Sequence, residues 1–261
     1  MTSKTWAIIT GASSGIGTEL ARELAGLSYN LVIVARREER LNQLALELKS
    51  KYSVKVQVIT LDLLKDGACE RLYAETKDLN IEILINNAGF GLCKKFADTS
   101  MDSIKNIMKL NMEVPTELTR LYLKDMLKTG SGYICQIASI ASYLPVPYYS
   151  VYGATKSYLR HFSNTLYYEL KNTGVSHTVF NPGFTRTEFF DVAGQKLVFN
   201  QNIISQSSNT VAKRALKAMF RKKRSALSSF INWYTACVIG TFIPKTLIAN
   251  FVLRDMKKTH E

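Results

Sequence analysis

Short aliphatic runs alternate with amphipathic stretches along most of the chain, and this alternation restricts the fold more than any other feature. The runs that predict strands cover residues 5–10, 31–35, 54–61, 83–86, 132–138 and 175–181. The stretches that predict helices lie near residues 15–27, 38–51, 66–78, 100–128 and 151–172. The runs are too uniformly apolar to be half-exposed strands, so we expect both faces of the sheet to be covered. The pattern predicts an α/β fold, a doubly wound, Rossmann-like parallel sheet with right-handed crossovers.

The length of 261 residues fits a single domain of this class. No linker, low-complexity tract or repeat interrupts the first 225 residues. Cys69, Cys93, Cys135 and Cys237 have no metal-ligand spacing and suggest no disulfide framework, so we expect no metal and reduced thiols. Residues 1–4 contain no apolar segment typical of a cleaved signal. These features favour a cytoplasmic protein.

A glycine-rich segment, Thr-Gly-Ala-Ser-Ser-Gly-Ile-Gly at residues 10–17, follows the first predicted strand and opens the first predicted helix. Glycine has no Cβ, so the turn can close tightly and a pyrophosphate can approach the backbone. The helix start adds free N–H groups and the positive end of the helix dipole. Strand, loop and helix in this order predict a dinucleotide site. Its expected residues are Gly11, Ser13, Ser14, Gly15, Ile16 and Gly17.

The second predicted strand ends at Ala35 and is followed by Arg36 and Arg37. A site that prefers NAD would place a carboxylate here, to accept a hydrogen bond from the adenosine ribose 2′-hydroxyl. Two guanidinium groups suit a 2′-phosphate instead, so the sequence favours NADP(H). The alternative is that the arginines pair with Glu38 and Glu39 as a solvated helix start.

Asp62 follows the third predicted strand, at the same edge of the sheet. Its carboxylate is a candidate acceptor for the adenine amino group. A turn or helix-cap role fits the position nearly as well.

The pattern Tyr-x-x-x-Lys occurs three times, beginning at Tyr73, Tyr152 and Tyr167, so by itself it identifies no site. Their surroundings distinguish them. Ser139 stands thirteen residues upstream of Tyr152, at the end of a predicted strand. Because ligands of parallel sheets bind at the carboxyl ends of the strands, we expect only Tyr152 to share a site with a strand-end hydroxyl.

The spacing between Tyr152 and Lys156 has a chemical use. Residues four apart stack on one helix face, so the Lys156 ammonium can lie beside the Tyr152 phenol. A free phenol has a pKa near 10, and a cation at roughly 4 Å would stabilise the phenolate by ~4 kcal/mol at an effective dielectric constant of ~20. Ser139 would hydrogen-bond the substrate oxygen. We expect Tyr152 to act as general acid and base while hydride moves between a nicotinamide and a carbonyl carbon.

Together these motifs resemble those of the short-chain dehydrogenase/reductase family, over about residues 5–225. The family's TGxxxGxG and NNAG patterns match residues 10–17 and 86–89, and its Ser/Tyr/Lys set matches Ser139, Tyr152 and Lys156. The resemblance implies an NADP(H)-dependent oxidoreductase whose catalytic, cofactor-binding domain comprises residues 1–225.

The resemblance also implies roles for further residues. Asn111 matches a helical asparagine that kinks its helix and holds a proton-relay water, which completes the catalytic set. Tyr152 and Lys156 would also contact the cofactor, Lys156 through the nicotinamide ribose. The other implied cofactor contacts are Asn87, Ala88, Gly89, Pro182, Gly183, Thr185 and Thr187. Thr185 stands where the family more often has Val or Ile, a departure that concerns the cofactor's hydroxyl contacts and not the activity.

Apolar segments are expected to roof the site. They are residues 144–147 after the Ser139 strand, Phe90, and the group Phe184, Phe189, Phe190 and Phe199. Such a lining suits a small hydrophobic ketone or aldehyde better than a sugar or an acid. The alternative is that several of these side chains belong to the core.

The net charge of +13 is concentrated near the C-terminus, where eleven Lys and Arg from residue 213 onward face only Asp255 and Glu261. The chain has no recognised nucleic-acid motif, so we expect no specific nucleic-acid partner. Residues 213–224 predict a basic helix, and residues 226–261 an apolar and basic helical extension interrupted by Gly240 and Pro244. These breaks and several polar residues argue against a membrane span.

Two accounts of the extension remain open. It can pack over the substrate pocket or a partner subunit. Alternatively, basic flanks around an apolar stretch suit peripheral contact with an anionic membrane. By the family resemblance, we expect a homodimer or homotetramer formed through the helices near residues 100–128 and 151–172. An alternative function is a catalytically silent NADP-binding regulatory or scaffold protein, against which the intact Asn111, Ser139, Tyr152 and Lys156 count.

Overall fold

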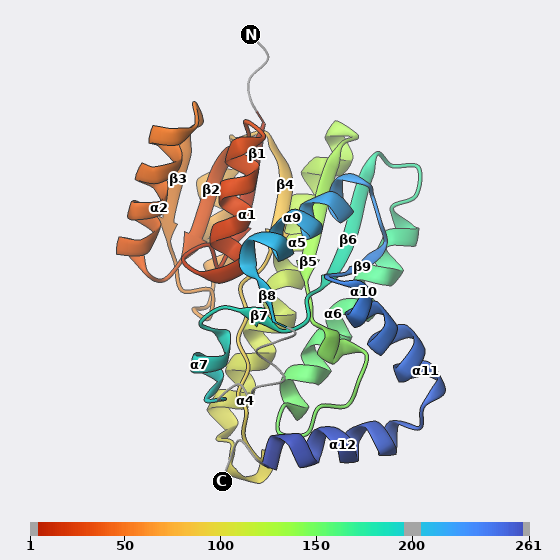
Figure 1. The fold of residues 1–261 in the computed structure, drawn as a ribbon. Coiled ribbons are helices and arrows are strands. Elements are labelled where there is room, and N and C mark those ends of the chain that lie inside the picture. Colours follow the sequence, from red (N-terminus) through yellow and green to blue (C-terminus); the bar gives the residue numbers. More distant parts are fainter. Residues whose placement is uncertain (1–4, 196–204, 258–261) are drawn as a thin grey trace.

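The computed structural model describes residues 5–195 and 205–257 (Figure 1). Its centre is a seven-stranded parallel sheet in the order β3-β2-β1-β4-β5-β6-β9. The strands are β1 (Trp6–Thr10), β2 (Asn30–Ala35), β3 (Val56–Thr60), β4 (Ile81–Asn86), β5 (Gly132–Ile137), β6 (Val175–Asn181) and β9 (Ser225–Leu227). The strand order reverses between β1 and β4, which confirms the doubly wound, Rossmann-like α/β fold and places a ligand crevice at their carboxyl ends.

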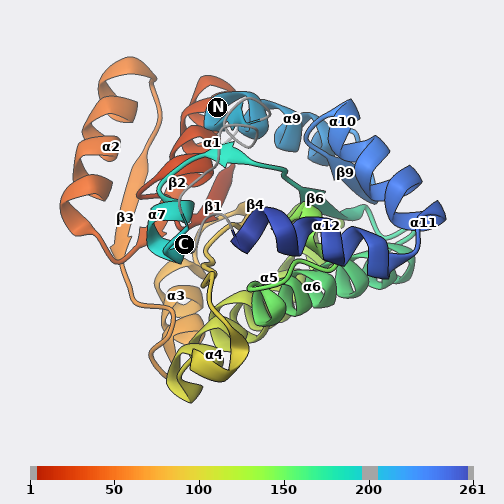
Figure 2. The same ribbon diagram turned by 60° about the horizontal axis from the view of Figure 1, so that its bottom comes forward.

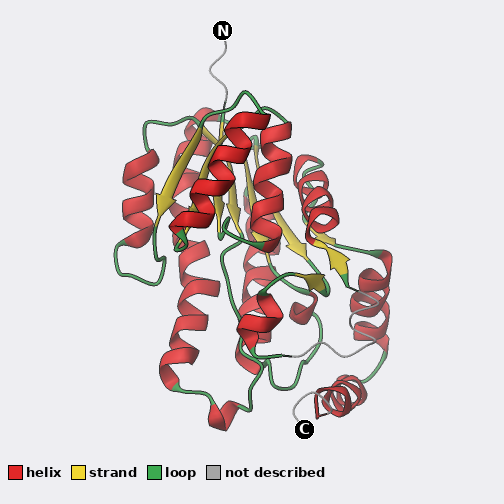
Figure 3. Cartoon of the chain, turned by 60° about the vertical axis from the view of Figure 1, so that its left-hand side comes forward, coloured by secondary structure: helices red, strands yellow, loops and turns green. Residues whose placement is uncertain are grey.

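Helices cover both faces of the sheet (Figures 1 and 3). One layer consists of α1 (Gly15–Gly26), α2 (Glu38–Lys51) and α9 (Ser208–Phe220), and the other of α3 (Ala68–Thr76), α5 (Val114–Thr129) and α6 (Ser150–Glu169). Alternate residues of β1 enter different cores, since Ala7 and Ile9 pack on the α1 side and Ile8 on the opposite side. All seven residues of β6 are buried. Two covered faces explain why the strand sequences are continuously apolar.

The predicted helix at residues 100–128 is divided in the structure. It consists of α4 (Met101–Met108), a π-helical turn (Lys109–Glu113) and α5. Asn111 is buried within the π-helical turn. A π-helical turn widens the backbone locally and is frequent at functional sites. This irregularity agrees with the helix kink that the family resemblance implied at Asn111.

The seventh strand, β9, was not predicted. Its three residues pair in parallel with the end of β6, where Phe180 faces Ala226. The segment Ser-Ala-Leu is too short to produce a strand pattern by itself, and it follows a basic run. The preceding helix α9 also begins earlier than expected, because the Ser207 side chain caps it by accepting from the Thr210 N–H. The face of α9 that carries Val211 and Ala215 is buried, so α9 is a core helix with a basic outer side.

The remaining elements lie beyond the carboxyl ends of the strands. Two-residue strands β7 (Thr185–Arg186) and β8 (Gln206–Ser207) pair in parallel, and α7 (Phe189–Ala193) follows β7. Short 3₁₀ turns occupy Phe96–Asp98 and Ile140–Ser142.

The C-terminal extension is helical and crosses the carboxyl end of the sheet (Figures 1 and 2). It contains α10 (Phe230–Trp233), a π-helical turn (Tyr234–Ile239), α11 (Gly240–Phe242) and α12 (Lys245–Lys257). Gly240 packs against Leu144, and Val252 of α12 joins an apolar cluster around Tyr152. The inner side of the extension therefore packs over the predicted site. Within the described ranges, we find no helix whose length and hydropathy would allow it to cross a membrane.

Candidate active site

The glycine-rich loop between β1 and α1 has the backbone geometry that its sequence predicted. Gly11 and Gly15 have positive φ angles of 68° and 57°. A Cβ atom on Gly17 would lie 2.3 Å from the Gly11 carbonyl oxygen, so only glycine fits there. The Ser14 side chain does not cap α1, and the first turn of α1 contains no acidic residue. The exposed N–H groups and the tight loop fit the diphosphate of a dinucleotide.

The NNAG segment after β4 is tied to this loop by hydrogen bonds. The Thr10 hydroxyl accepts from the N–H groups of Asn87 and Ala88, both at 3.0 Å. The Asn87 side chain donates to the carbonyl oxygens of Thr10 at 2.9 Å and of Gly11 at 3.2 Å. These bonds bring the predicted cofactor residues of two neighbouring strands together at the point where the strand order reverses.

Asn111 and Lys156 meet beneath Gly89. The Asn111 Nδ2 donates to the Phe90 carbonyl oxygen at 2.9 Å and to the Thr155 hydroxyl at 3.1 Å. The Asn111 Oδ1 accepts from the Phe90 N–H at 3.2 Å. A Cβ atom on Gly89 would lie 2.9 Å from that oxygen and 3.3 Å from the Lys156 Nζ. Glycine at position 89 therefore leaves room beside both polar groups.

Ser139, Tyr152 and Lys156 are adjacent at the carboxyl end of β5. The Ser139 hydroxyl is hydrogen-bonded to the Tyr152 phenol. The Lys156 Nζ lies 5.7 Å from the centre of the Tyr152 ring and donates to the Ile137 carbonyl oxygen at 2.9 Å. Ile137 is the last residue of β5, so the lysine is anchored to the strand that carries Ser139. The structure thus brings all four predicted catalytic residues to one place.

Burial determines the acid–base behaviour of this group. It raises the pKa of Tyr152 to about 12, against the opposing effect of the Ser139 hydrogen bond. It lowers the pKa of Lys156 to about 8. We had expected Lys156 to lower the pKa of the phenol. That expectation is wrong for the protein alone, because desolvation disfavours the phenolate more than a cation 5.7 Å from the ring centre favours it.

The other two Tyr-x-x-x-Lys patterns lie elsewhere. Tyr73 donates a hydrogen bond to Asp125 at 2.6 Å, between α3 and α5. Tyr167 lies near the end of α6, where its ring contacts the ring of Tyr168. Neither tyrosine is at the carboxyl end of the sheet. The strand-end hydroxyl alone did not distinguish them, because Thr60, the last residue of β3, also stands thirteen residues before Tyr73.

The arginines after β2 make contacts that the sequence did not predict. Arg37 forms an ion pair with Glu188 at 2.7 Å and donates to the Ser13 hydroxyl at 3.1 Å. Arg40, which was not predicted, pairs with the same carboxylate at 2.5 Å. Arg36 is exposed and forms no ion pair within the described ranges. The suggested pairing with neighbouring glutamates is therefore wrong.

Asp62 and the residues after β6 have structural partners. The Asp62 carboxylate accepts from the Leu64 N–H at 3.1 Å, which is the turn role considered for it. The Pro182 carbonyl oxygen accepts from the Ile140 N–H at 2.9 Å, close to Ser139. The Thr185 hydroxyl donates to the Gly183 carbonyl oxygen at 3.0 Å.

Thr187 and Ile16 complete the set of predicted cofactor residues. A Cβ atom on Gly15 would lie 2.8 Å from the Thr187 Cγ2, so Thr187 faces the glycine-rich loop. Ile16 packs against the core on the α1 side of the sheet. Their roles toward a cofactor stay predictions, as do those of Asp62, Pro182, Gly183 and Thr185.

An apolar cluster packs against the partly buried Tyr152. Its members come from the loop after β4, the loop before α6, α7 and α12: Cys93, Val146, Tyr148, Tyr149, Phe189, Ala193 and Val252. The Phe189 ring lies 5.2 Å from the Tyr152 ring, measured between centroids. Phe184 and Phe190 stack on each other at 5.7 Å. Phe189 and Val146 therefore line the site as expected, whereas Phe199 lies outside the described residues.

Two contacts at this site had no sequence signal that we recognised. A Cβ atom on Gly91 would lie 2.9 Å from the Tyr152 Cδ2 and 3.1 Å from the Phe189 Cζ. Gly183 packs against Asn232 of α10 and donates its N–H to the Ser228 hydroxyl at 3.0 Å. The second pair ties the C-terminal extension to the loop after β6.

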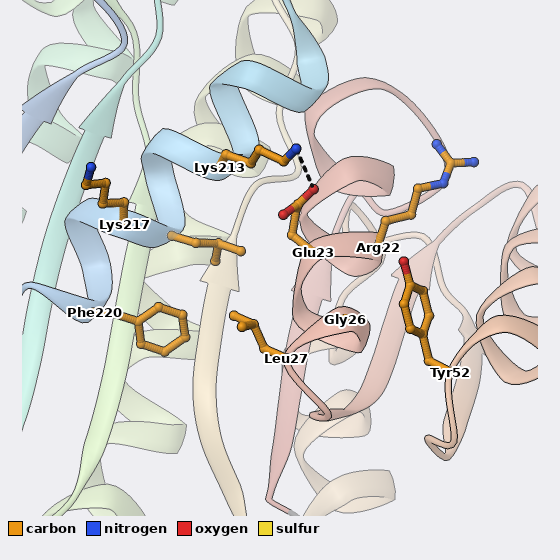
Figure 4. Close-up of a pocket in the computed structure, with 9 residues that line it drawn as sticks. Arg22, Glu23, Gly26, Leu27, Tyr52, Lys213, Lys217 and Phe220 are labelled. Carbon is orange, nitrogen blue, oxygen red and sulfur yellow. Dashed lines mark ion pairs between the residues drawn. The ribbon is translucent and has the colours of Figure 1, made fainter.

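A separate hollow lies between α1, α2 and α9, remote from these residues (Figure 4). It is lined at the ends of α1 and α9 by Gly26, Leu27 and Phe220, with the Lys213–Glu23 ion pair at 3.7 Å. Helix α1 begins at the glycine-rich loop and ends at the opposite edge of the sheet. The hollow contains none of the predicted site residues.

Comparison with known proteins identifies one protein family. A family model described as "short chain dehydrogenase" matches residues 5–197. A curated relative, very-long-chain 3-oxoacyl-CoA reductase of Neurospora crassa, is 37% identical over 176 residues, which are 66% of this chain and 53% of that protein. The chain thus spans about half the length of this relative.

Two solved structures are similar over most of the chain. A short-chain dehydrogenase from Sphingobium yanoikuyae in complex with NADPH has a TM-score of 0.81 and 30% identity, covering 87% of this chain and 88% of that one. A bulky-bulky ketone specific alcohol dehydrogenase from Comamonas testosteroni has a TM-score of 0.78 and 30% identity, covering 89% and 90%.

Proposed function

We propose that this chain, which belongs to the short-chain dehydrogenase family, is an NADP(H)-dependent reductase of long-chain 3-oxoacyl thioesters. The observation that carries the proposal is the position of the Tyr152 phenol. It is hydrogen-bonded to Ser139, lies beside Lys156 and opens toward an apolar cluster at the carboxyl end of the sheet. The product would be the 3-hydroxyacyl thioester.

A nicotinamide cofactor would supply the hydride, and the glycine-rich loop would hold its diphosphate. The tight loop at Gly17 and the room beside Gly89 fit such a group. Lys156 would contact the ribose, and Arg36 and Arg37 would bind the 2′-phosphate. The NADPH complex of the Sphingobium relative supports this choice of cofactor.

Tyr152 would donate its proton to the carbonyl oxygen as the carbon is reduced. A pKa of about 12 keeps the phenol protonated at neutral pH, which is the form that reduction requires. Ser139 would hold the carbonyl oxygen against the phenol. The Lys156 ammonium, still largely protonated at neutral pH with a pKa of about 8, would stabilise the phenolate that remains. Oxidation would start from the phenolate, which the raised pKa makes scarce at neutral pH.

Several features support an acyl substrate larger than the small carbonyl compound first expected. The Neurospora relative is named as a reductase of very-long-chain 3-oxoacyl-CoA. The cluster around Tyr152 offers apolar contacts from four separate segments, including Phe189 and Val252. Lys94 and Lys95 are exposed directly after the buried Cys93 of this cluster, where they can meet the phosphates of a coenzyme A group.

A second candidate is reduction of a bulky hydrophobic ketone. The Comamonas enzyme, named for bulky ketones, matches this chain over nine-tenths of that enzyme's length. We do not retain the catalytically silent alternative. The chain has the complete Asn111, Ser139, Tyr152 and Lys156 set in one place, and its relatives are named as oxidoreductases.

The test follows NADPH absorbance with the full chain and a series of substrates. We expect kcat/KM to rise at least about tenfold from acetoacetyl-CoA to 3-oxopalmitoyl-CoA, because burial of only two of the additional methylenes, at ~0.8 kcal/mol each, is enough for a tenfold change. Turnover of bulky aryl ketones without turnover of any thioester would select the second candidate. Absence of turnover with both classes, for a protein that binds NADPH, would contradict the proposal.

A further inference from the structure

The C-terminal extension exposes an unusual amount of apolar surface. Half of the exposed large hydrophobic side chains in the described ranges lie in α10 to α12 and the turns between them. They are Phe230, Ile231, Trp233, Tyr234, Phe242, Ile243, Leu247 and Phe251. Phe242 is 80% exposed and Phe251 is 75% exposed. Concentrated apolar exposure of this kind marks an interaction surface.

Helix α12 is apolar on two adjacent sides, because Leu247 and Phe251 directly precede Ile248 and Val252 and so lie about 100° away around the helix. Ile248 is buried and Val252 packs into the cluster around Tyr152, so one side faces the active site. Leu247, Phe251 and Arg254 are exposed and recur at the four- and three-residue spacing of a single helix face. A surface helix normally places polar residues on its outer side. In α12, the exposed side next to the buried one instead carries an apolar stripe, Leu247 and Phe251, that ends at the cation Arg254.

From residue 226 to residue 254, before Asp255, the charges have one sign. Lys245 and Arg254 are the charged residues of positions 226–254, and both are exposed. We define the tail face as Phe242, Ile243, Leu247 and Phe251 together with these two cations. It lies at the carboxyl end of the sheet, where Figure 2 shows α12 in front.

The basic run at the end of α9 lies elsewhere. The Lys222 ammonium lies 5.9 Å from the ring centre of Tyr133, the second residue of β5, near the amino ends of the strands. The basic run precedes the apolar extension in the sequence. In the structure it does not lie beside the tail face, so the expectation that it flanks the extension is wrong. Any charge that assists the tail face must come from Lys245, Arg254 and their neighbours.

We propose that the tail face docks on the surface of an anionic lipid bilayer. Aromatic and aliphatic side chains next to cations, with no carboxylate from residue 226 to residue 254, match the boundary between acyl chains and acidic headgroups. A symmetric dimer through this face would place the same cations near each other, which disfavours a second copy as the occupant. The inner side of α12 packs into the apolar cluster around Tyr152, so docking brings the bilayer close to that cluster whichever carbonyl compound is reduced.

The experiment is sedimentation of the full chain with vesicles of phosphatidylcholine alone or mixed with phosphatidylglycerol. We expect binding to the mixed vesicles, and weaker binding at high salt. Phe242→Ser with Phe251→Ser should weaken binding at least about tenfold, because two largely exposed rings lose their burial in lipid. Leu46→Ser is the matched control, since Leu46 is 70% exposed on α2.

Two double variants distinguish binding through the tail face from binding through the net positive charge of the chain. Lys245→Gln with Arg254→Gln should weaken binding to the mixed vesicles, whereas Lys222→Gln with Lys223→Gln, which removes equal charge, should change it little. Equal loss in both double variants, or unchanged binding in the phenylalanine variant, would overturn the proposal. So would failure of the wild type to bind. A wild-type dimer that the phenylalanine variant dissociates, measured by analytical ultracentrifugation without lipid, would assign the face to a second copy instead.

Discussion

The carboxylate of Glu188 lies 2.7 Å from the guanidinium group of Arg37, although 151 residues separate them in the sequence. Arg40 pairs with the same carboxylate at 2.5 Å. The two guanidinium groups hold the pKa of Glu188 below its usual value. Glu188 directly follows Thr187, which faces the glycine-rich loop. Glu188 therefore pairs with the Arg37 guanidinium group, which we expect to bind the 2′-phosphate of NADP(H).

Replacement of this competing carboxylate should favour the phosphorylated cofactor. We expect Glu188→Gln to tighten NADPH binding up to about fivefold, because an exposed ion pair contributes at most ~1 kcal/mol, and to leave NADH binding unchanged. Fluorescence titration of the two cofactors measures the effect. Glu39→Gln, the same change on exposed α2, is the control. An equal gain for NADPH and NADH would rule out competition for the phosphate site.

The opposite change tests the arginines themselves. Arg36→Ala with Arg37→Ala should weaken NADPH binding by about tenfold or more, since charge-assisted bonds to phosphate are each worth ~1.5–3 kcal/mol. NADH binding should change much less. The same titration gives both affinities. Equal losses for the two cofactors would mean that the arginines are only surface charges.

Gly91 should be required for the position of the Tyr152 phenol, the proposed proton donor. A Cβ atom there would lie 2.9 Å from the Tyr152 Cδ2, so the ring must move in Gly91→Ala. We expect kcat to fall by about tenfold or more, because small displacements of reacting groups are costly, with a smaller change in NADPH affinity. Gly26→Ala is the control, since its nearest neighbour would be a Tyr52 atom at 3.7 Å. Wild-type kcat in Gly91→Ala would refute this role.

Burial of the Lys156 ammonium should lower the free energy of unfolding, although the side chain is needed for activity. Its pKa falls from 10.5 to about 8 on burial, so between these pH values the unfolded chain binds more protons than the folded protein. Stability therefore rises with pH across this window, and below about pH 8 the full cost of up to ~3 kcal/mol applies. We expect Lys156→Met to be inactive but more stable than wild type at pH 7, by less than this figure because the bond to Ile137 is lost.

Urea unfolding of the cofactor-free protein at neutral and high pH checks the expectation. The advantage of Lys156→Met should shrink as the pH rises from about 8 toward 10.5. Lys105→Met, on the exposed side of α4, should show no such trend. A variant that is less stable than wild type at pH 7, or a difference that does not depend on pH, would show that burial of the charge is not the dominant effect.

Local sequence patterns were sufficient to predict β1 to β6 and to predict that Ser139, Tyr152 and Lys156 lie together. Each of these strands is a buried apolar run, and the sheet requires their carboxyl ends to share one edge. The contact between Ser139 and Tyr152 follows from that requirement and from their spacing of thirteen positions. In contrast, β9 is three residues long, and only its pairing with β6 makes it a strand.

Sequence patterns did not predict the contacts between segments that are distant in the chain. Nothing near Glu188 indicates that Arg37 and Arg40 lie beside it, because α7 reaches them only through the fold. The role of Gly91 depends on the Tyr152 ring, which comes from α6. For the extension, the sequence offered packing or membrane contact as alternatives. The structure shows that one side of α12 packs and that an adjacent apolar side is exposed.

The most direct test of the account concerns Tyr152. Tyr152→Phe removes only the hydroxyl that would protonate the carbonyl oxygen, so the apolar ring and its contact with Phe189 remain. With 3-oxopalmitoyl-CoA and NADPH, we expect kcat to fall at least about a hundredfold while the NADPH affinity changes little. Tyr167→Phe, which also lies four residues before a lysine, should retain wild-type kcat. Turnover by Tyr152→Phe at the wild-type rate would contradict the proposed mechanism.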